Sequence, residues 1–545
     1  MSPPSWRSVL REGQRSGAPS RVSESAVAIV GSGIAATAVA RELVRAGYDV
    51  VLFERGPEYP YPHAQQFREK IYLLHESPRY ALPPDVKALT LSGDYAHDLN
   101  RETISVIGGS ATHWGATTPR MAPEDFRTGS LYGYGDDWPI GYEELEPYYC
   151  RAEAMLGVSG TDADNPFAPP RTQPYPLPPF ELSWSDRLLT ERLSRRGIVL
   201  HTSPQARTRV SYDGRPECLN FGTCSFCPIG ACYSPGHHLK RLKATARCTV
   251  YPRTVVRRIV ADAQGHARAI VHRPVEGGAD YEHAARAIVV AAGAIESARL
   301  LLLSADTRHP DGLGNAGEQV GRHFVFHHMW NGTLQYPEPL YAGRIGVMTG
   351  MSQQFRTTPE RGRHGALRVD FSSNFLGDLP KPPDDASPDD VVRMLRPFAS
   401  CRGIVLETES APSPRKYVTL SGECDRFGDP LAHVQYEAGD FEHENFVFAR
   451  SVAERFASAT GAEIAAFVAE DRYHSAWHHM GTCRMSAGPA DGVVDSFGQV
   501  HGCPGLFVAG SAVFVGCSGA SNPTLTLVAL ALRTAEQVAG LLGRG

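Results

Sequence analysis

Hydrophobic positions near the start of the chain predict a strand, a helix and a second strand. Residues 26–30, AVAIV, form a short apolar run of the kind found in buried strands. In the segment GSGIAATAVARELVRAGY that follows, alanine, valine and leucine recur at helical spacing, and Gly47 closes the helix. A second strand is predicted over residues 49–53, directly before Glu54. The pattern therefore predicts a strand–turn–helix–strand unit with glycines in its first turn.

The predicted turn carries the motif G-x-G-x-x-A in the context that dinucleotide binding requires. Gly31 permits the tight turn, Gly33 lets the backbone approach a pyrophosphate, and Ala36 allows close packing of helix on strand. Glu54 can hold a ribose hydroxyl, and the helix N-terminus favours an anion. The unit predicts dinucleotide binding, and the motif alone does not separate NAD from FAD.

Composition bounds the class of protein. A chain of 545 residues is expected to form two or more domains. Its 42 % hydrophobic and 21 % charged residues are typical of a soluble globular enzyme, and a net charge of −5 gives no reason to expect nucleic acid as partner. No apolar run is expected to reach the roughly 20 residues of a membrane span.

The N-terminal segment bears on location. Residues 1–24 lack the apolar stretch of a secretory signal, which predicts a disordered polar extension. The expected location is the cytoplasm, with reduced thiols. Export together with a signal-bearing partner stays open.

Four further sequence motifs, one near residue 110 and three near the C-terminus, indicate a protein family. A glycine-rich loop, VIGGSATHWGATTPRM, covers residues 106–121. Near the C-terminus lie WHHMGTCRM (477–485), VVDSFGQVHGCPGLFVAGSAVF (493–514) and SGASNPTLTLVALALRTAEQVAGLL (518–542). Together the blocks resemble the glucose–methanol–choline (GMC) family of FAD oxidoreductases. The resemblance implies an α/β fold in which a Rossmann-type FAD-binding domain is interleaved with an α+β substrate-binding domain.

The resemblance also implies how the chain is divided. FAD-binding segments are expected at 25–150, 205–330 and 485–545, and substrate-binding segments at 151–204 and 331–484. RAIVVAAGAIESARLLLLS, residues 286–304, looks like the family's second flavin-side strand and helix. The similarity weakens over 335–470, the region from which the substrate pocket is built.

One branch of the family is more similar than the rest. DDWPIGYEELEPYYCRAEAMLGV (136–158) and CPIGACY (227–233) look like the flavoprotein subunits of bacterial FAD-dependent glucose, gluconate or fructose dehydrogenases. This implies a sugar, a polyol or a sugar-containing metabolite as substrate, and it leaves a small subunit or a cytochrome open as partner. The electron acceptor, whether oxygen, a quinone or a redox protein, is not determined, although a dehydrogenase is favoured over an oxidase. A member that retains flavin for a lyase or structural role is the alternative of a different class.

Contacts to FAD are implied along the whole chain. The histidine of THW, residues 112–114, matches one that pyranose oxidases can join covalently to the flavin. For His113 the alternatives are such a bond, or packing over the dimethylbenzene edge beside Trp114. Gly510 departs from the acidic residue that many relatives carry there. The implied FAD-binding residues are Gly31, Gly33, Ala36, Glu54, Gly109, Ser110, His113, Trp114, Gly293, Gly510, Ser511 and Thr524.

Two residues are candidates for catalysis. Alcohol oxidation needs a base for the hydroxyl proton, and neutral imidazole suits that role. The family pattern selects His478 as the base and Asn522 as its companion, while His479 is expected to pack beside them. The alternatives are a core histidine bonded to backbone and, because Asn522 precedes Pro523, a helix cap. His327 and His328 are expected to be structural.

Four cysteines stand close together in PECLNFGTCSFCPIGACY, residues 216–233. Their spacing is C-x5-C-x2-C-x4-C, and compact thiolates suit an iron–sulfur cluster. The sugar-dehydrogenase branch binds a cluster with three cysteines spaced C-x5-C-x3-C, which implies Cys218, Cys224 and Cys227 and leaves Cys232 without a counterpart. A loop of buried cysteines without metal, and a zinc site that includes His237 and His238, stay open.

Overall fold

The computed structural model describes residues 22–72, 89–95, 99, 102, 104–221, 224–341, 348–372, 383, 385–469 and 473–543. Most of the predicted N-terminal extension lies outside these residues. Residues 22–24 instead belong to the first strand, β1 (Val22–Val30), which begins before the apolar run. The hydroxyls of Ser23 and Ser25 bond to the two ring nitrogens of His283, so the polar start of the strand also pairs with a neighbour.

The first sheet has seven strands and contains the predicted nucleotide-binding unit. Its order is β5-β2-β1-β8-β7-β6, with β16 paired to β8. β1, β2, β5, β8 and β16 are parallel, whereas β7 pairs antiparallel with β8 and β6. The remaining strands are β2 (Val50–Phe53), β5 (Cys248–Tyr251), β6 (Thr254–Ala261), β7 (Ala267–Pro274), β8 (Tyr281–Val290) and β16 (Leu506–Val508).

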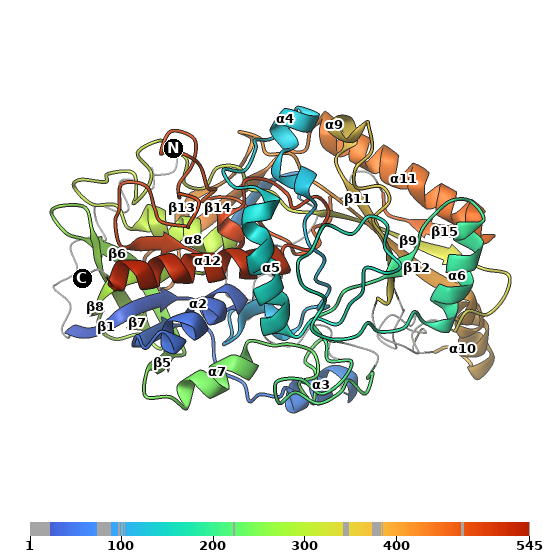
Figure 1. The fold of residues 1–545 in the computed structure, drawn as a ribbon, viewed down its shortest axis with the longest axis horizontal. Coiled ribbons are helices and arrows are strands. Elements are labelled where there is room, and N and C mark those ends of the chain that lie inside the picture. Colours follow the sequence, from blue (N-terminus) through green and yellow to red (C-terminus); the bar gives the residue numbers. More distant parts are fainter. Residues whose placement is uncertain are drawn as a thin grey trace.

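Helices from distant parts of the chain pack around this sheet (Figure 1). The predicted helix after β1 is α2 (Ile34–Arg45), and the C-terminal helix α12 (Thr524–Leu542) packs against it and against α5 (Tyr142–Leu156). The strand and helix expected within 286–304 are β8 and α8 (Gly293–Leu303). α8 contacts β6 and also a three-stranded sheet of order β13-β14-β3. That sheet consists of β13 (Lys416–Cys424), β14 (Pro430–Tyr436) and β3 (Leu89–Gly93).

A six-stranded sheet lies toward the other end of the molecule (Figure 1). Its order is β15-β9-β12-β11-β10-β4, with antiparallel pairing throughout. The long helix α11 (Asp440–Thr460) contacts β9, β12 and α6 (Trp184–Ser194). The strands are β4 (His201–Thr202), β9 (His328–Gln335), β10 (Gly350–Ser352), β11 (Leu367–Ser372), β12 (Cys401–Thr408) and β15 (Glu463–Phe467). The other helices are α3 (Ala64–Tyr72), α4 (Thr128–Tyr132), α7 (Gly236–Lys243), α9 (Arg361–His364) and α10 (Pro388–Leu395).

The chain thus crosses repeatedly between a Rossmann-like sheet and a second, antiparallel sheet, and the predicted fold class is confirmed. The expectation about apolar runs was wrong for α12. This 19-residue helix, with a mean hydropathy of 1.4, is long and apolar enough to cross a membrane by length and composition. It is 67 % buried over the most apolar window, because it packs between α2 and α5 as a core helix.

Candidate active site

The turn between β1 and α2 has the backbone that a nucleotide needs. Gly31 has a φ of +98°, and a Cβ there would lie 2.5 Å from the carbonyl oxygen of Ala291, so only glycine fits. Gly33 is the N-cap of α2, and no side chain caps this helix end. Helix N-termini of this kind bind anions through their first N–H groups. A Cβ on Gly109 would lie 3.2 Å from the Cα of Gly33, so the 106–114 loop lies against the turn.

Glu54 lies at the carboxyl end of β2 and is buried. Its Oε2 accepts a hydrogen bond of 2.7 Å from the Ser32 hydroxyl, and its Oε1 accepts one of 2.8 Å from the Gly56 N–H. Burial raises the pKa of this carboxyl, and the hydrogen bonds oppose that rise. An oriented acceptor beside an uncapped helix N-terminus suits the ribose and pyrophosphate of FAD. The residues present therefore fit the cofactor.

The other implied FAD contacts are spread over several segments of the chain. Gly510 adopts a φ of +103° and approaches α2, where its Cβ would lie 3.5 Å from the Cβ of Ala35. Ser110 belongs to the short helix η2 (Gly109–Thr112), and Ser511 begins η6 (Ser511–Val513). Ala36 is buried in α2, Gly293 begins α8 and Thr524 begins α12.

The cysteine loop packs directly on His113. The Ser225 hydroxyl donates a 2.8 Å hydrogen bond to the His113 carbonyl, and the Phe226 ring stacks on the imidazole at 5.7 Å. Trp114 donates from Nε1 to the carbonyl oxygen of Tyr233 at 2.8 Å. The loop therefore covers the residue expected to border the flavin edge.

Within the loop, the cysteine sulfurs have protein partners. Cys224, Cys227 and Cys232 are buried, and Cys218 is half-buried. A hydrogen bond to Cys224, followed by burial, raises the pKa of Cys232 well above its usual value, and burial raises that of Cys218. Among the described residues, two sets of three ligand atoms converge within 4.8 Å of one another, and neither set includes a cysteine. His237 and His238, considered above as zinc partners of the cysteines, face Asp213 instead.

The structure brings the two candidate catalytic residues together. Asn522 Nδ2 lies 3.1 Å from His478 Nε2, and the Asn522 Oδ1 accepts a 2.6 Å hydrogen bond from Arg368. Because the guanidinium is only a donor, it fixes the amide with Nδ2 toward the imidazole, so His478 Nε2 is an acceptor. Asn522 does not cap α12, whose N-cap is Pro523 without a side-chain hydrogen bond.

His478 is held as a neutral imidazole. Burial, and then Arg368 and His479, lower its pKa to about 3. Its Nδ1 lies 3.0 Å from Nδ1 of His327, which was expected to be structural and lies against the base. Oε2 of Glu407 lies 3.7 Å from His478 Nδ1 and 3.9 Å from His327 Nδ1. Nε2 is therefore unprotonated at neutral pH, the state that a general base needs before it takes a proton from substrate.

A buried ionic network on β11 and β12 supports this pair. Arg368 lies 2.8 Å from a carboxylate oxygen of Asp370 and 2.8 Å from one of Glu407, and it also donates to the Ala520 carbonyl. Burial raises the pKa of Asp370, and it raises that of Glu407 to about 7, although Arg368 opposes both shifts. Arg368 therefore links the substrate-side sheet to Asn522.

Sequence reasoning missed Arg368, Asp370 and Glu407. A signal existed in β11, LRVDFS, where alternation places Arg368 and Asp370 on one face and the buried Leu367, Val369 and Phe371 on the other. Charged residues at alternate positions in an otherwise apolar strand indicate a buried ionic face.

Comparison with known proteins identifies the family and supports the fold. Residues 380–531 match the family described as GMC oxidoreductase, and residues 29–84 match an NAD(P)-binding Rossmann-like domain. The chain is 30 % identical to the fructose dehydrogenase large subunit of Gluconobacter japonicus, covering 95 % of this chain and 98 % of the relative. It is 29 % identical to 2-methyl-1,2-propanediol dehydrogenase of Mycolicibacterium austroafricanum, covering 94 % of each. Paromamine 6'-oxidase of Streptomyces fradiae is 28 % identical over 94 % of this chain and 91 % of its own.

Solved structures share the fold. Formate oxidase from Aspergillus oryzae superposes with a TM-score of 0.68 at 15 % identity, covering 96 % of this chain and 99 % of the oxidase. Pyridoxine 4-oxidase from Mesorbium loti gives a TM-score of 0.64 at 17 % identity, covering 94 % and 98 %. At these identities the likeness concerns the fold alone.

Proposed function

The chain belongs to the GMC oxidoreductase family of flavin enzymes that oxidise alcohols at a CH–OH group, and we propose that its substrate is a sugar, a polyol or a sugar-containing metabolite. Among its relatives, one is named for fructose and another for paromamine. The contact of 3.1 Å between His478 Nε2 and Asn522 Nδ2 is the observation that supports oxidation most directly.

The roles of the two residues follow from their hydrogen-bonding capacity. His478 Nε2 accepts the proton of the substrate hydroxyl, and Asn522 Nδ2 donates a hydrogen bond to the same oxygen. Arg368 keeps the amide from rotating, because it occupies Oδ1. FAD, when bound, supplies the acceptor for the hydride that leaves the carbinol carbon.

We further propose that the enzyme is a dehydrogenase with an iron–sulfur cluster held by Cys218, Cys224 and Cys227. Soft thiolates from one loop suit such a cluster, and the loop packs on His113, next to the expected flavin edge. One relative is named as the large subunit of its dehydrogenase, which favours a partner subunit here. The competing function is an oxidase whose loop only covers the flavin.

The proposed substrate class can be tested by anaerobic titration of the holoenzyme. Fructose, glucose, gluconate, an aminosugar, the diol 1,2-propanediol and the simple aliphatic alcohol 1-propanol are added in turn, and bleaching of the flavin absorption is followed. We expect at least one sugar or polyol to bleach the flavin completely. Bleaching by simple aliphatic alcohols only would overturn the sugar assignment, and no bleaching by any CH–OH donor would favour a lyase or structural role.

The proposed cluster predicts a distinct visible spectrum. We expect broad absorption beneath the flavin bands and about two to four iron atoms per chain, the range that iron–sulfur clusters contain. Metal analysis and the spectrum of the purified protein check this. A clean flavin spectrum without iron would contradict the cluster and favour the competing function, an oxidase whose loop only covers the flavin.

A covalent bond between the flavin and His113 is tested separately. The protein is precipitated with acid, and yellow colour that stays in the pellet would indicate such a bond.

A further inference from the structure

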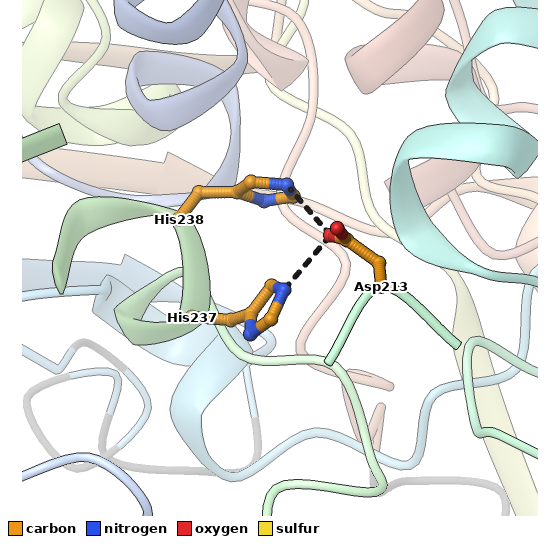
Figure 2. Close-up of side chains that lie close together, drawn as sticks. All are labelled: Asp213, His237 and His238. Carbon is orange, nitrogen blue, oxygen red and sulfur yellow. Dashed lines mark hydrogen bonds and ion pairs between the residues drawn. The ribbon is translucent and has the colours of Figure 1, made fainter. Parts of the chain in front are cut away.

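Two imidazoles and a carboxylate, none of them from the catalytic pair, converge beside the first turn of α7 (Figure 2). His237 and His238 lie in the first turn of α7, and Asp213 lies before the loop begins. Asp213 Oδ2 is 2.9 Å from His237 Nε2 and 3.6 Å from His238 Nε2. The catalytic chemistry proposed above uses none of the three.

Their spacing suits one metal ion. Zinc bonds to nitrogen and oxygen at about 2.0–2.1 Å in tetrahedral sites, which places neighbouring ligand atoms roughly 3.3 Å apart. The three ligand atoms all lie within 4.8 Å of one another, and two of the separations bracket that value. The two rings converge although the residues are adjacent, with centroids 4.9 Å apart.

Outer partners orient these ligands. His238 Nδ1 bonds to the Tyr233 hydroxyl at 3.0 Å, which leaves Nε2 toward Asp213. Arg241 donates to Asp213 Oδ1 at 2.7 Å, which leaves Oδ2 toward the imidazoles. Hydrogen bonds of this kind support the ligands in known metal sites.

Zinc binds imidazole in its neutral form, so both rings would act as ligands without their Nε2 protons. The positive charge of Arg241 opposes a dication, so the site should be weaker than a zinc finger.

We propose that Asp213 Oδ2, His237 Nε2 and His238 Nε2 form a zinc site. Two nitrogen ligands favour zinc over Ca²⁺ and Mg²⁺, which prefer oxygen. A surface cavity of about 460 Å³ is lined in part by Tyr212, Asp213 and His238, so the site borders a space that opens to solvent. Because Asp213 precedes the cysteine loop and the histidines follow it, the ion joins the two ends of the loop that packs on His113.

Equilibrium dialysis of the holoenzyme against Zn²⁺, with metal analysis, tests the site. The wild-type protein is expected to bind one zinc ion per chain. The dissociation constant for zinc should be higher by about 10- to 100-fold or more in Asp213→Asn and in His237→Gln. His266→Gln is the matched control, because exposed His266 lies 3.5 Å from Asp262 as an isolated pair and should bind zinc as wild type does. Equal binding by all four proteins, or no binding by wild type, would overturn the proposal.

Zinc-edge X-ray absorption of the wild-type protein gives a second test that does not depend on how the variants fold. Nitrogen and oxygen ligands at about 2.0–2.1 Å are expected. A sulfur shell at about 2.3 Å would place the zinc on the cysteines and overturn the assignment. The zinc edge is insensitive to iron, so a cluster in the loop does not obscure the result.

Discussion

Replacing His478 with alanine is expected to slow substrate reduction of the flavin by about 100- to 10,000-fold, the usual contribution of a positioned base. FAD should stay bound, because the cradle at Gly31, Gly33 and Glu54 is formed by β1, α2 and β2. The loss follows from the geometry, since Nε2 of His478 is the acceptor that faces Asn522. Anaerobic stopped-flow absorption measures the reduction rate, and the visible spectrum of the variant measures bound FAD.

The adjacent histidine provides the control. His479 Nε2 lies 3.1 Å from a carboxylate oxygen of Glu102, and among the described residues its side chain makes no hydrogen bond to His478 or Asn522. His479→Gln should therefore retain most of the wild-type rate. Reduction of His478→Ala at the wild-type rate would show that another group takes the proton. Equal losses in both variants would indicate damage to packing rather than loss of a base.

The fold could be predicted where its signals are local. The turn at Gly31, the apolar spacing of α2 and the strand before Glu54 each depend on a few neighbouring residues, so the Rossmann unit could be found from the sequence. The blocks around His478 and Asn522 came from family resemblance instead, because 44 positions separate them. Their contact is made by the fold, and no local pattern shows it.

The supporting network depends on strand register, which the sequence does not specify locally. Arg368 and Glu407 stand directly opposite each other on β11 and β12, and a shift of one residue would separate them. The contact of Asp213 with His237 could not be predicted from local sequence either. It forms only when the turn that carries Asp213 folds against α7. Residues that act through long-range pairing were therefore missed, while those in contiguous motifs were found.

Replacement of Arg368 by methionine is expected to lower the free energy of unfolding by about 3–5 kcal/mol, the loss typical of breaking a buried ion pair. Arg368 is 1 % exposed, and the variant leaves Asp370, Glu407 and the Asn522 amide oxygen without its guanidinium. Urea denaturation followed by tryptophan fluorescence measures the change. The exposed ion pair of Arg195 with Glu191 supplies the control, since Arg195→Met should change stability by less than about 1 kcal/mol.

The pH dependence of this loss separates unpaired charge from lost packing. Burial already raises the pKa of Asp370, and it raises that of Glu407 to about 7, so without Arg368 the folded state holds protons that the unfolded chain releases. A protein that binds more protons in its folded state than in its unfolded state loses stability as pH rises. The free energy of unfolding lost in Arg368→Met should therefore grow from about pH 5 to about pH 8. Neutralising both carboxyls, with Asp370→Asn and Glu407→Gln added to Arg368→Met, should recover part of the loss. A penalty that is independent of pH and not relieved in the triple variant would mean that Arg368 stabilises the fold through packing alone.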